Sequence, residues 1–213
     1  IYFTSGGSES DNWAIKAVAE SFSDKGKHII TTKIEHHAVL HTCEYLERHG
    51  FDITYLNVDS DGKVRLDELK KSIREDTILI SVMTANNEIG TIQPVKNVCN
   101  IAAEYAIPVH TDAVAAYGHI PVNVKELGVD YLSVSAHKIG GAKGTGFLYA
   151  KAANINPYIY GGGQEKGKRS GTENVAGIMG LAKAAEIAQE KLDSRIEEEN
   201  ITKNYITDRI LSC

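Results

Sequence analysis

Two polar side chains that could do chemistry follow β-prone runs of this sequence. Asp112 comes directly after Pro108–Thr111, and Lys138 closes the segment Ser133–Lys138, which also holds hydroxyl and imidazole groups. A carboxylate at the end of a buried strand is costly unless a cation pairs with it. A lysine at a sheet end can be desolvated and become nucleophilic. Taken singly, Asp112 could instead cap the following turn, and Lys138 could be an ordinary surface lysine.

A third polar group lies in Gly6-Gly7-Ser8, just ahead of a predicted helix. Backbone N–H groups and a hydroxyl at a helix N-terminus form a ready anion site, although Ser8 could also be a simple N-cap. One ligand would use all three groups. Pyridoxal phosphate has a phosphate for the anion cradle, a protonatable ring nitrogen for Asp112 and an aldehyde for Lys138. Together the residues therefore predict a site for this cofactor.

Alternating strands and helices must bring these groups together. Such alternation predicts an α/β fold, a three-layer α/β/α sandwich around a mainly parallel, mixed sheet of about seven strands. Ligands of such sheets bind at the carboxyl ends of the strands, where Asp112 and Lys138 would meet. The predicted strands are Ile1–Thr4, His28–Thr32, Ile53–Leu56, Thr77–Met83, Pro108–Thr111, Tyr131–Ser135 and Gly146–Ala150.

Apolar residues at helical spacing predict the covering helices. The tail from about Thr172 is rich in Ala, Glu, Lys and Ile and is predicted as one long helix. The other predicted helices contain Ile15–Phe22, Val39–Leu46, Leu66–Ile73 and Val95–Ala102.

Composition excludes several classes of protein. The 213 residues carry a net charge of −5 and include three cysteines. An acidic chain is a poor ligand for nucleic acid, and three cysteines make no disulfide framework. With no apolar run of 18 residues, no membrane partner is expected, and free thiols suit a reducing cytoplasm. The start at Ile1, without an initiator Met, suggests a chain cut at its front.

Three weaker motifs are interpreted as structural. Gly162–Arg169 nearly matches a phosphate-binding loop, but Arg169 stands where a magnesium-binding hydroxyl is needed. His37 and His41 have the i, i+4 spacing of a helical zinc pair, yet no further ligands are evident, so surface histidines and no metal site are predicted. The three cysteines are predicted to be non-nucleophilic: Cys43 and Cys99 as small buried hydrophobes, and Cys213 as the last residue.

The sequence resembles the cysteine desulfurases, members of the class V aminotransferase group of fold type I pyridoxal-phosphate enzymes. The matching segments follow the family's order and span almost the whole chain. They are TSGGSESDN (4–12), KIEHHAVLHTCEYLE (33–47), NNEIGTIQP (86–94), HTDAV (110–114), LSVSAHK (132–138), KGTGFLY (143–149) and GGGQEKGKRSGTEN (161–174).

This resemblance implies a role for each matching position. Lys138 would form the Schiff base with the cofactor, and Asp112 would keep the ring nitrogen protonated. His36 would stack on the ring and assist proton transfer, and Asn87 would lie near the ring's phenolic oxygen. In a homodimer, Thr172 would reach the phosphate bound by the neighbouring subunit. The remaining phosphate ligands would be Gly7, Ser8, Ser135 and His137.

The resemblance also implies the reaction. Sulfur would be taken from L-cysteine, giving L-alanine and an enzyme persulfide that serves a sulfur-acceptor or scaffold protein in iron–sulfur cluster or thio-cofactor assembly. Residues 1–213 would be the large cofactor-binding domain. The family's front segment, its persulfide cysteine loop and its small C-terminal domain are expected to lie outside the chain. The chain alone is therefore not expected to complete sulfur transfer.

One departure from the family lies beside the predicted site. Ala115 stands where the family has a glutamine that hydrogen-bonds the phenolic oxygen, which predicts weaker cofactor binding. Two alternatives remain open. One is another pyridoxal-phosphate enzyme, such as a selenocysteine lyase, a cysteine sulfinate desulfinase or an aminotransferase. The other is a non-catalytic scaffold, which would have no reason to keep such costly polar groups at strand ends.

Overall fold

The computed structural model describes residues 1–151 and 155–212. The strands are β1 (Tyr2–Thr4), β2 (His28–Thr32), β3 (Asp52–Leu56), β4 (Thr77–Ser81), β5 (Val109–Asp112), β6 (Tyr131–Ser135) and β7 (Gly146–Ala150). The helices are α1 (Gly7–Ser21), α2 (His37–Glu47), α3 (Leu66–Ser72), α4 (Val95–Glu104), α5 (Val124–Leu127), the 3₁₀ turn η1 (Ala136–Ile139), α6 (Gln164–Gly167), α7 (Val175–Glu190) and α8 (Leu192–Leu211).

The strands form one mixed sheet in the order β1-β7-β6-β5-β4-β2-β3. Strands β2 to β6 are parallel to one another, whereas β7 is antiparallel to both of its neighbours. All residues of β4, the apolar run Thr77–Ser81, are buried, as a parallel strand covered on both faces requires. The predicted mainly parallel, mixed sheet is confirmed.

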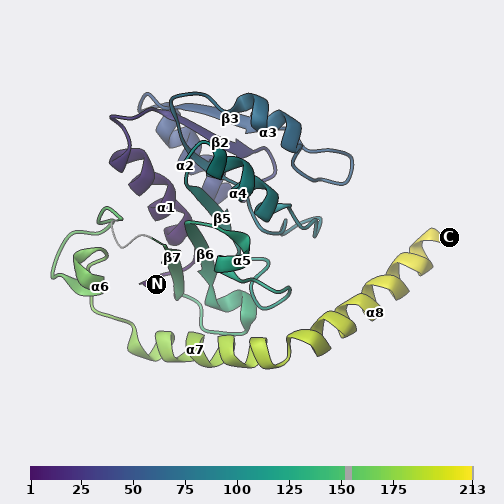
Figure 1. The fold of residues 1–213 in the computed structure, drawn as a ribbon. Coiled ribbons are helices and arrows are strands. Elements are labelled where there is room, and N and C mark those ends of the chain that lie inside the picture. The colour runs from purple at the N-terminus through teal and green to yellow at the C-terminus, as the bar shows by residue number, and fades with distance from the viewer. Residues whose placement is uncertain (152–154, 213) are drawn as a thin grey trace.

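Helices cover both faces of the sheet, which confirms the three-layer sandwich (Figure 1). Helices α1 and α2 pack on one face, where Trp13 is fully buried among residues such as Ile29 and Leu79. Helices α3 and α4 pack on the other face, where Val98 meets Ile80. The sheet thus lies between two apolar cores, and its strand ends are the places left for polar groups.

The edge of the sheet at β7 is tightly packed against the turn that precedes α1. A Cβ at Gly146 would lie 2.5 Å from the carbonyl oxygen of Val134 and 2.7 Å from Cα of Gly6. Only glycine allows these two backbones to approach so closely. This contact fixes the turn Gly6–Gly7 beside the end of β6.

The predicted single helix in the tail is wrong. The chain breaks at Lys191 (φ −101°, ψ 9°) into α7 and α8. Helix α7 packs Leu181 and Ala188 on η1, whereas Leu192 is the buried residue of α8. Burial of Leu192 therefore redirects the axis, and α8 leaves the body of the molecule (Figure 1).

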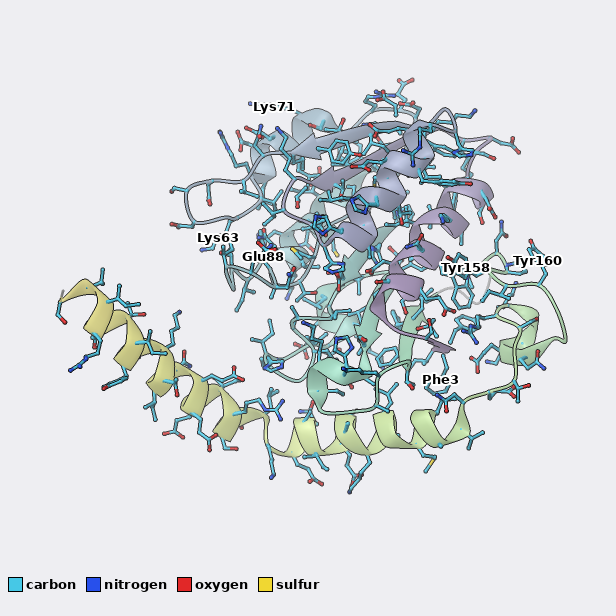
Figure 2. The ribbon with its side chains drawn as sticks, turned by 180° about the vertical axis from the view of Figure 1, so that it is seen from behind. Phe3, Lys63, Lys71, Glu88, Tyr158 and Tyr160 are labelled. Carbon is cyan, nitrogen blue, oxygen red and sulfur yellow. The ribbon has the colours of Figure 1, made fainter. Side chains whose placement is uncertain are left out.

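Exposed apolar side chains lie mainly along α7 and α8 and beside α6. Figure 2 shows Tyr158 and Tyr160 beside α6, where Tyr160 is 78% exposed. Ile201, Tyr205 and Ile210 of α8 are also exposed. Within the described part of the chain, every helix is too short or too polar to cross a bilayer.

Candidate functional site

A cavity of about 250 Å³ opens at the carboxyl ends of the parallel strands. It gathers every predicted site residue except Thr172, and it adds Asp11, Met83 and Val114, which the sequence interpretation missed. The lining residues are Gly7, Ser8, Asp11, His36, Met83, Asn87, Asp112, Val114, Ala115, Ser135, His137 and Lys138. The crossover topology thus brings together groups that are far apart in the sequence.

One end of the cavity is built to receive an anion. Helix α1 begins at Gly7, and its N-cap is Gly6 (φ 151°), which makes no side-chain capping bond. The N-cap alternative for Ser8 is therefore wrong, and this hydroxyl is not used for capping. Beside this helix start, Ser135 Oγ at the end of β6 lies 2.8 Å from Nδ1 of His137. First-turn N–H groups and these side chains make the cradle that a phosphate fits.

An ion pair neutralises the acidic residue in the first turn of α1. Arg169 donates to Glu9 through Nε at 2.6 Å and Nη2 at 3.0 Å. Burial by itself raises the pKa of Glu9, but the hydrogen bonds from Arg169 and Ser5 outweigh it and leave this pKa lowered. Without Arg169, the Glu9 charge would oppose an anion at the same helix end.

Asp112 ends β5 and is 5% exposed. Its Oδ1 accepts a hydrogen bond from the backbone N–H of Val114 at 2.8 Å, so the turn-capping alternative also holds. Burial, followed by the negative charge of Asp11, raises the pKa of Asp112 to about 7. No salt bridge holds this carboxyl within the described residues. Its chemistry fits a cationic N–H group in the cavity.

Asp11 is a second carboxyl at the same place, and it comes from α1. It is 1% exposed, and its Oδ1 has no hydrogen-bond partner among the described residues. Burial raises the pKa of Asp11 to about 7, although a hydrogen bond from Ser133 lowers it. One ligating atom each of Asp11, His36 and Asp112 lies within 4.8 Å of the others. The sequence did contain a signal for Asp11. It lies four residues before Ile15 and so falls on the apolar face of α1, where a carboxylate is unusual.

The loop between β2 and α2 presents His36. Nδ1 of His36 accepts from the backbone N–H of Ala38 at 3.1 Å, so the ring caps α2. Behind it, the buried Glu35 accepts from Thr32 Oγ1 at 2.7 Å and from the backbone N–H of Met83 at 3.1 Å. These bonds tie the loop to the end of β2 and to the segment that follows β4, and the imidazole lines the cavity.

Asn87 is held by its neighbour Asn86. The amide of Asn86 donates to the carbonyl oxygen of Ile34 at 2.8 Å, and its Oδ1 accepts from the N–H groups of Glu88 and Ile89. The loop after β4 is thereby closed on itself and joined to the loop that carries His36. Asn87 remains exposed and lines the cavity.

Lys138 lies on η1, directly after β6. The turn ends at Gly140, whose φ of 83° suits glycine. Ala136 and Ile139 are buried against α7, so η1 has an anchored face and leaves Lys138 at the cavity. The predicted meeting of Asp112 and Lys138 at one sheet edge is confirmed by this geometry. An amine, a carboxyl and an anion cradle in one cavity are the groups that pyridoxal phosphate requires.

The other sequence motifs lie away from the cavity. Thr172 is exposed and lines a separate depression with Thr145 and Arg169, so its role toward a neighbouring subunit stays a prediction. The exposed rings of His37 and His41 stack with centroids 5.0 Å apart, and neither belongs to the trio of potential metal ligands among the described residues.

The cysteines of the described chain are inert in this structure. Cys43 and Cys99 are buried, and burial raises the pKa of each thiol to about 12. The prediction that they are structural is consistent with this environment. Cys213 lies outside the described residues. The phosphate-loop-like segment forms the short helix α6 and does not follow a strand directly.

Comparisons with known proteins agree on one family. The model of the aminotransferase class-V family matches residues 1–213. The chain is 58% identical over 212 residues to the cysteine desulfurase IscS of Methanosarcina thermophila, covering 99% of this chain and 52% of that protein. It is 60% identical over 206 residues to the cysteine desulfurase IscS of Dictyoglomus turgidum, covering 96% of this chain and 52% of that protein. The chain thus spans about half the length of the curated relatives it matches.

Solved structures give the same result. A NifS-like protein superimposes with a TM-score of 0.96 at 48% identity, covering 99% of this chain and 59% of that one. A structure described as SspA in complex with cysteine has a TM-score of 0.84 at 44% identity, covering 87% and 54%. The predicted resemblance and the predicted fold are confirmed. The chain belongs to the class V aminotransferase family, whose members depend on pyridoxal phosphate.

Proposed function

We propose that the protein is a pyridoxal-phosphate-dependent cysteine desulfurase and that residues 1–213 are its cofactor-binding large domain. The observation that supports this most strongly is the cavity at the strand ends. There Asp112, Lys138 and His36 face one volume beside an anion cradle. Relatives named cysteine desulfurase, at 58% and 60% identity, favour this chemistry over other members of the family.

Different residues of the cavity would bind different parts of the cofactor. Gly7 and Ser8 at the start of α1, with Ser135 and His137, would bind its phosphate. The free oxygen of Asp112 would accept a hydrogen bond from the ring N–H, and Lys138 would supply the amine that attaches covalently to the aldehyde. When bound, the cofactor supplies an electron sink for bonds broken at the substrate's α-carbon.

The chain's own groups then position the substrate and move its protons. His36 lines the cavity, and its Nδ1 accepts from the Ala38 N–H, which leaves Nε2 as the ring nitrogen not used in capping. This imidazole would stack on the cofactor and exchange a proton with the substrate. Asn87, at the mouth of the cavity, would orient the ring's phenolic oxygen. As a free amine at the cavity, Lys138 would accept and return a proton of the substrate.

The substrate would be L-cysteine, and the products L-alanine and a persulfide sulfur passed to an acceptor or scaffold protein for iron–sulfur or thio-cofactor assembly. The persulfide carrier is not assigned to Cys43 or Cys99, because both thiols are buried. Thr172, exposed beside Arg169, would reach the phosphate of a second subunit in a homodimer. A reducing compartment such as the cytoplasm suits free thiols.

Product analysis tests the proposal. The full-length protein, loaded with pyridoxal phosphate and given L-cysteine with excess thiol, is expected to release L-alanine and sulfide in equal amounts. The Lys138→Ala variant should release neither, whereas Lys125→Ala, an exposed lysine on α5, should behave as the wild type. Release of a keto acid, or turnover of L-selenocysteine with none of L-cysteine, would contradict the assignment and favour another class V activity.

A further inference from the structure

The cavity holds two buried carboxyls of like charge. Asp11 from α1 and Asp112 from β5 are 1% and 5% exposed. Both line the cavity, and their nearest oxygens lie within 4.8 Å of each other. At that separation and depth, two carboxylates repel strongly, so one of them holds a proton near neutral pH.

The ring that lies against Asp11, that of His110, adds no positive charge to relieve this repulsion. Nε2 of His110 lies 3.5 Å from Asp11 Oδ1, but burial lowers the pKa of His110 to about 4, so this ring is neutral. Its hydrogen bonds run to Ser81 at 2.8 Å and Ser133 at 3.0 Å. The Ser133 hydroxyl in turn donates to Asp11. This chain of neutral donors orients Asp11 without neutralising it.

Other ionisable groups around the pair come from three further elements. Glu35, ahead of α2, is buried and adds negative charge when ionised. His36 caps α2, and its positive form would attract the pair. His137 and Lys138 reach the cavity from η1, and both side chains are exposed to water. After burial itself, the largest effect on the pKa of Asp112 therefore comes from the charge of Asp11.

We propose that Asp11 is the proton-holding partner of Asp112. In the open cavity the two carboxyls share one proton, and a ligand that places a cationic N–H on Asp112 displaces it to solvent. In that step the carboxyl O–H bond breaks and its proton passes to water. Both carboxyls are then ionised, and the cationic N–H of the ligand balances part of their negative charge. This inference rests on the proposed function, since the cation it assumes is the cofactor's ring nitrogen.

The unpartnered oxygen of Asp11 supports this role. A buried carboxyl oxygen without a hydrogen bond costs free energy, so one that also borders a cavity is open to a proton or a ligand. Asp11 Oδ1 has no hydrogen-bond partner among the described residues, and the carboxyl lines the cavity. Asp11 is thus a positioning residue, which acts on a bound ligand through Asp112.

Proton counting on ligand binding tests the proposal. Pyridoxamine 5′-phosphate is a suitable probe, because it keeps the ring nitrogen and phosphate but cannot attach to Lys138. Its binding is measured by calorimetry in two phosphate-free buffers of different ionisation enthalpy, for the wild type and for Asp11→Asn. Protons contributed by the probe and by Lys138 are common to both proteins and cancel in the difference.

Near pH 6.5 the wild type is expected to release about half to one proton more than Asp11→Asn. By linkage, this difference makes the wild type bind the probe more tightly as pH rises. Below pH 7 the ratio of the wild-type affinity to the Asp11→Asn affinity should change by up to about tenfold per pH unit. Equal proton release by both proteins would overturn the proposal. The control Asp130→Asn, at the amino end of β6 and away from the cavity, should match the wild type.

A second measurement covers the case in which Asp11→Asn does not fold. In the infrared spectrum of the ligand-free Glu35→Gln protein, a protonated buried carboxyl band should persist to about pH 7 and vanish when the probe binds. Its absence at pH 6 would refute the shared proton. If the wild type binds no probe while this band is present, the proposed function fails and the shared proton stands.

Discussion

Replacing Glu35 with glutamine should change how the stability of the protein depends on pH. Glu35 is 5% exposed, and its Oε2 has no hydrogen-bond partner among the described residues. Burial raises its pKa from the ordinary 4.5 to about 8. Between these values the folded protein holds a proton that the unfolded chain has lost. The free energy of unfolding therefore falls as pH rises, by about 1.4 kcal/mol per pH unit.

The variant removes this dependence while keeping the shape of the side chain. Its amide oxygen still accepts from Thr32 and from the Met83 N–H, and its NH₂ group takes the place of the protonated oxygen. From pH 5 to pH 7 the stability of Glu35→Gln relative to the wild type should rise by about 2 to 3 kcal/mol. Above pH 8 the difference should level off, because Glu35 is then ionised in both states.

Urea unfolding at pH 5, 6, 7 and 8 measures this difference, because contributions from Asp11 and Asp112 are common to both proteins. Glu190→Gln, an exposed position near the end of α7, is the matched control and should run parallel to the wild type. A Glu35→Gln curve that also runs parallel to the wild type would refute the inference that this carboxyl is held neutral beside His36.

Three further changes test other parts of the site. Ala115→Gln should tighten pyridoxal phosphate binding roughly three- to tenfold, the value of one added hydrogen bond; an unchanged affinity and absorption titration would contradict this. Gly7→Ala places a Cβ 2.5 Å from Cγ2 of Val114, which should displace the start of α1 and weaken the binding of pyridoxal phosphate. An unchanged affinity would contradict the assignment of this helix start to the phosphate. Gly180→Ala meets nothing within 4 Å inside α7 and should stabilise the protein by about 0.5 to 1 kcal/mol in thermal unfolding; a loss of stability would contradict the packing described for α7.

The fold could be predicted from the sequence because the strand and helix patterns are each contained in a short segment, and no tertiary contact among the described residues of the sheet overrides them. Alternating strands and helices implied parallel pairing, and parallel pairing implied that Asp112 and Lys138 share one sheet edge. The tail shows the limit of such signals. Nothing in its helical composition marks Lys191 as a break, because the break depends on where Leu192 finds a buried contact.

The polar residues that the sequence interpretation missed, Asp11, Glu35 and Asn86, are all buried. Asp11 lies on the apolar stripe of α1, so only its unusual position distinguished it from a surface acid. Glu35 and Asn86 tie loops to residues about 50 positions away, at Met83 and Ile34. Sequence patterns report the face of an element but not such tertiary partners, and the buried groups around the cavity were therefore found only in three dimensions.

Locating a trapped cofactor tests the central claim most directly. The protein is mixed with pyridoxal phosphate, reduced with borohydride and digested, and the modified peptide is identified by mass. The account predicts a visible absorption band before reduction and a single adduct on Lys138, with neither in the Lys138→Ala variant. An adduct spread over exposed lysines such as Lys125, or no band at all, would contradict the assignment of this cavity as the cofactor site.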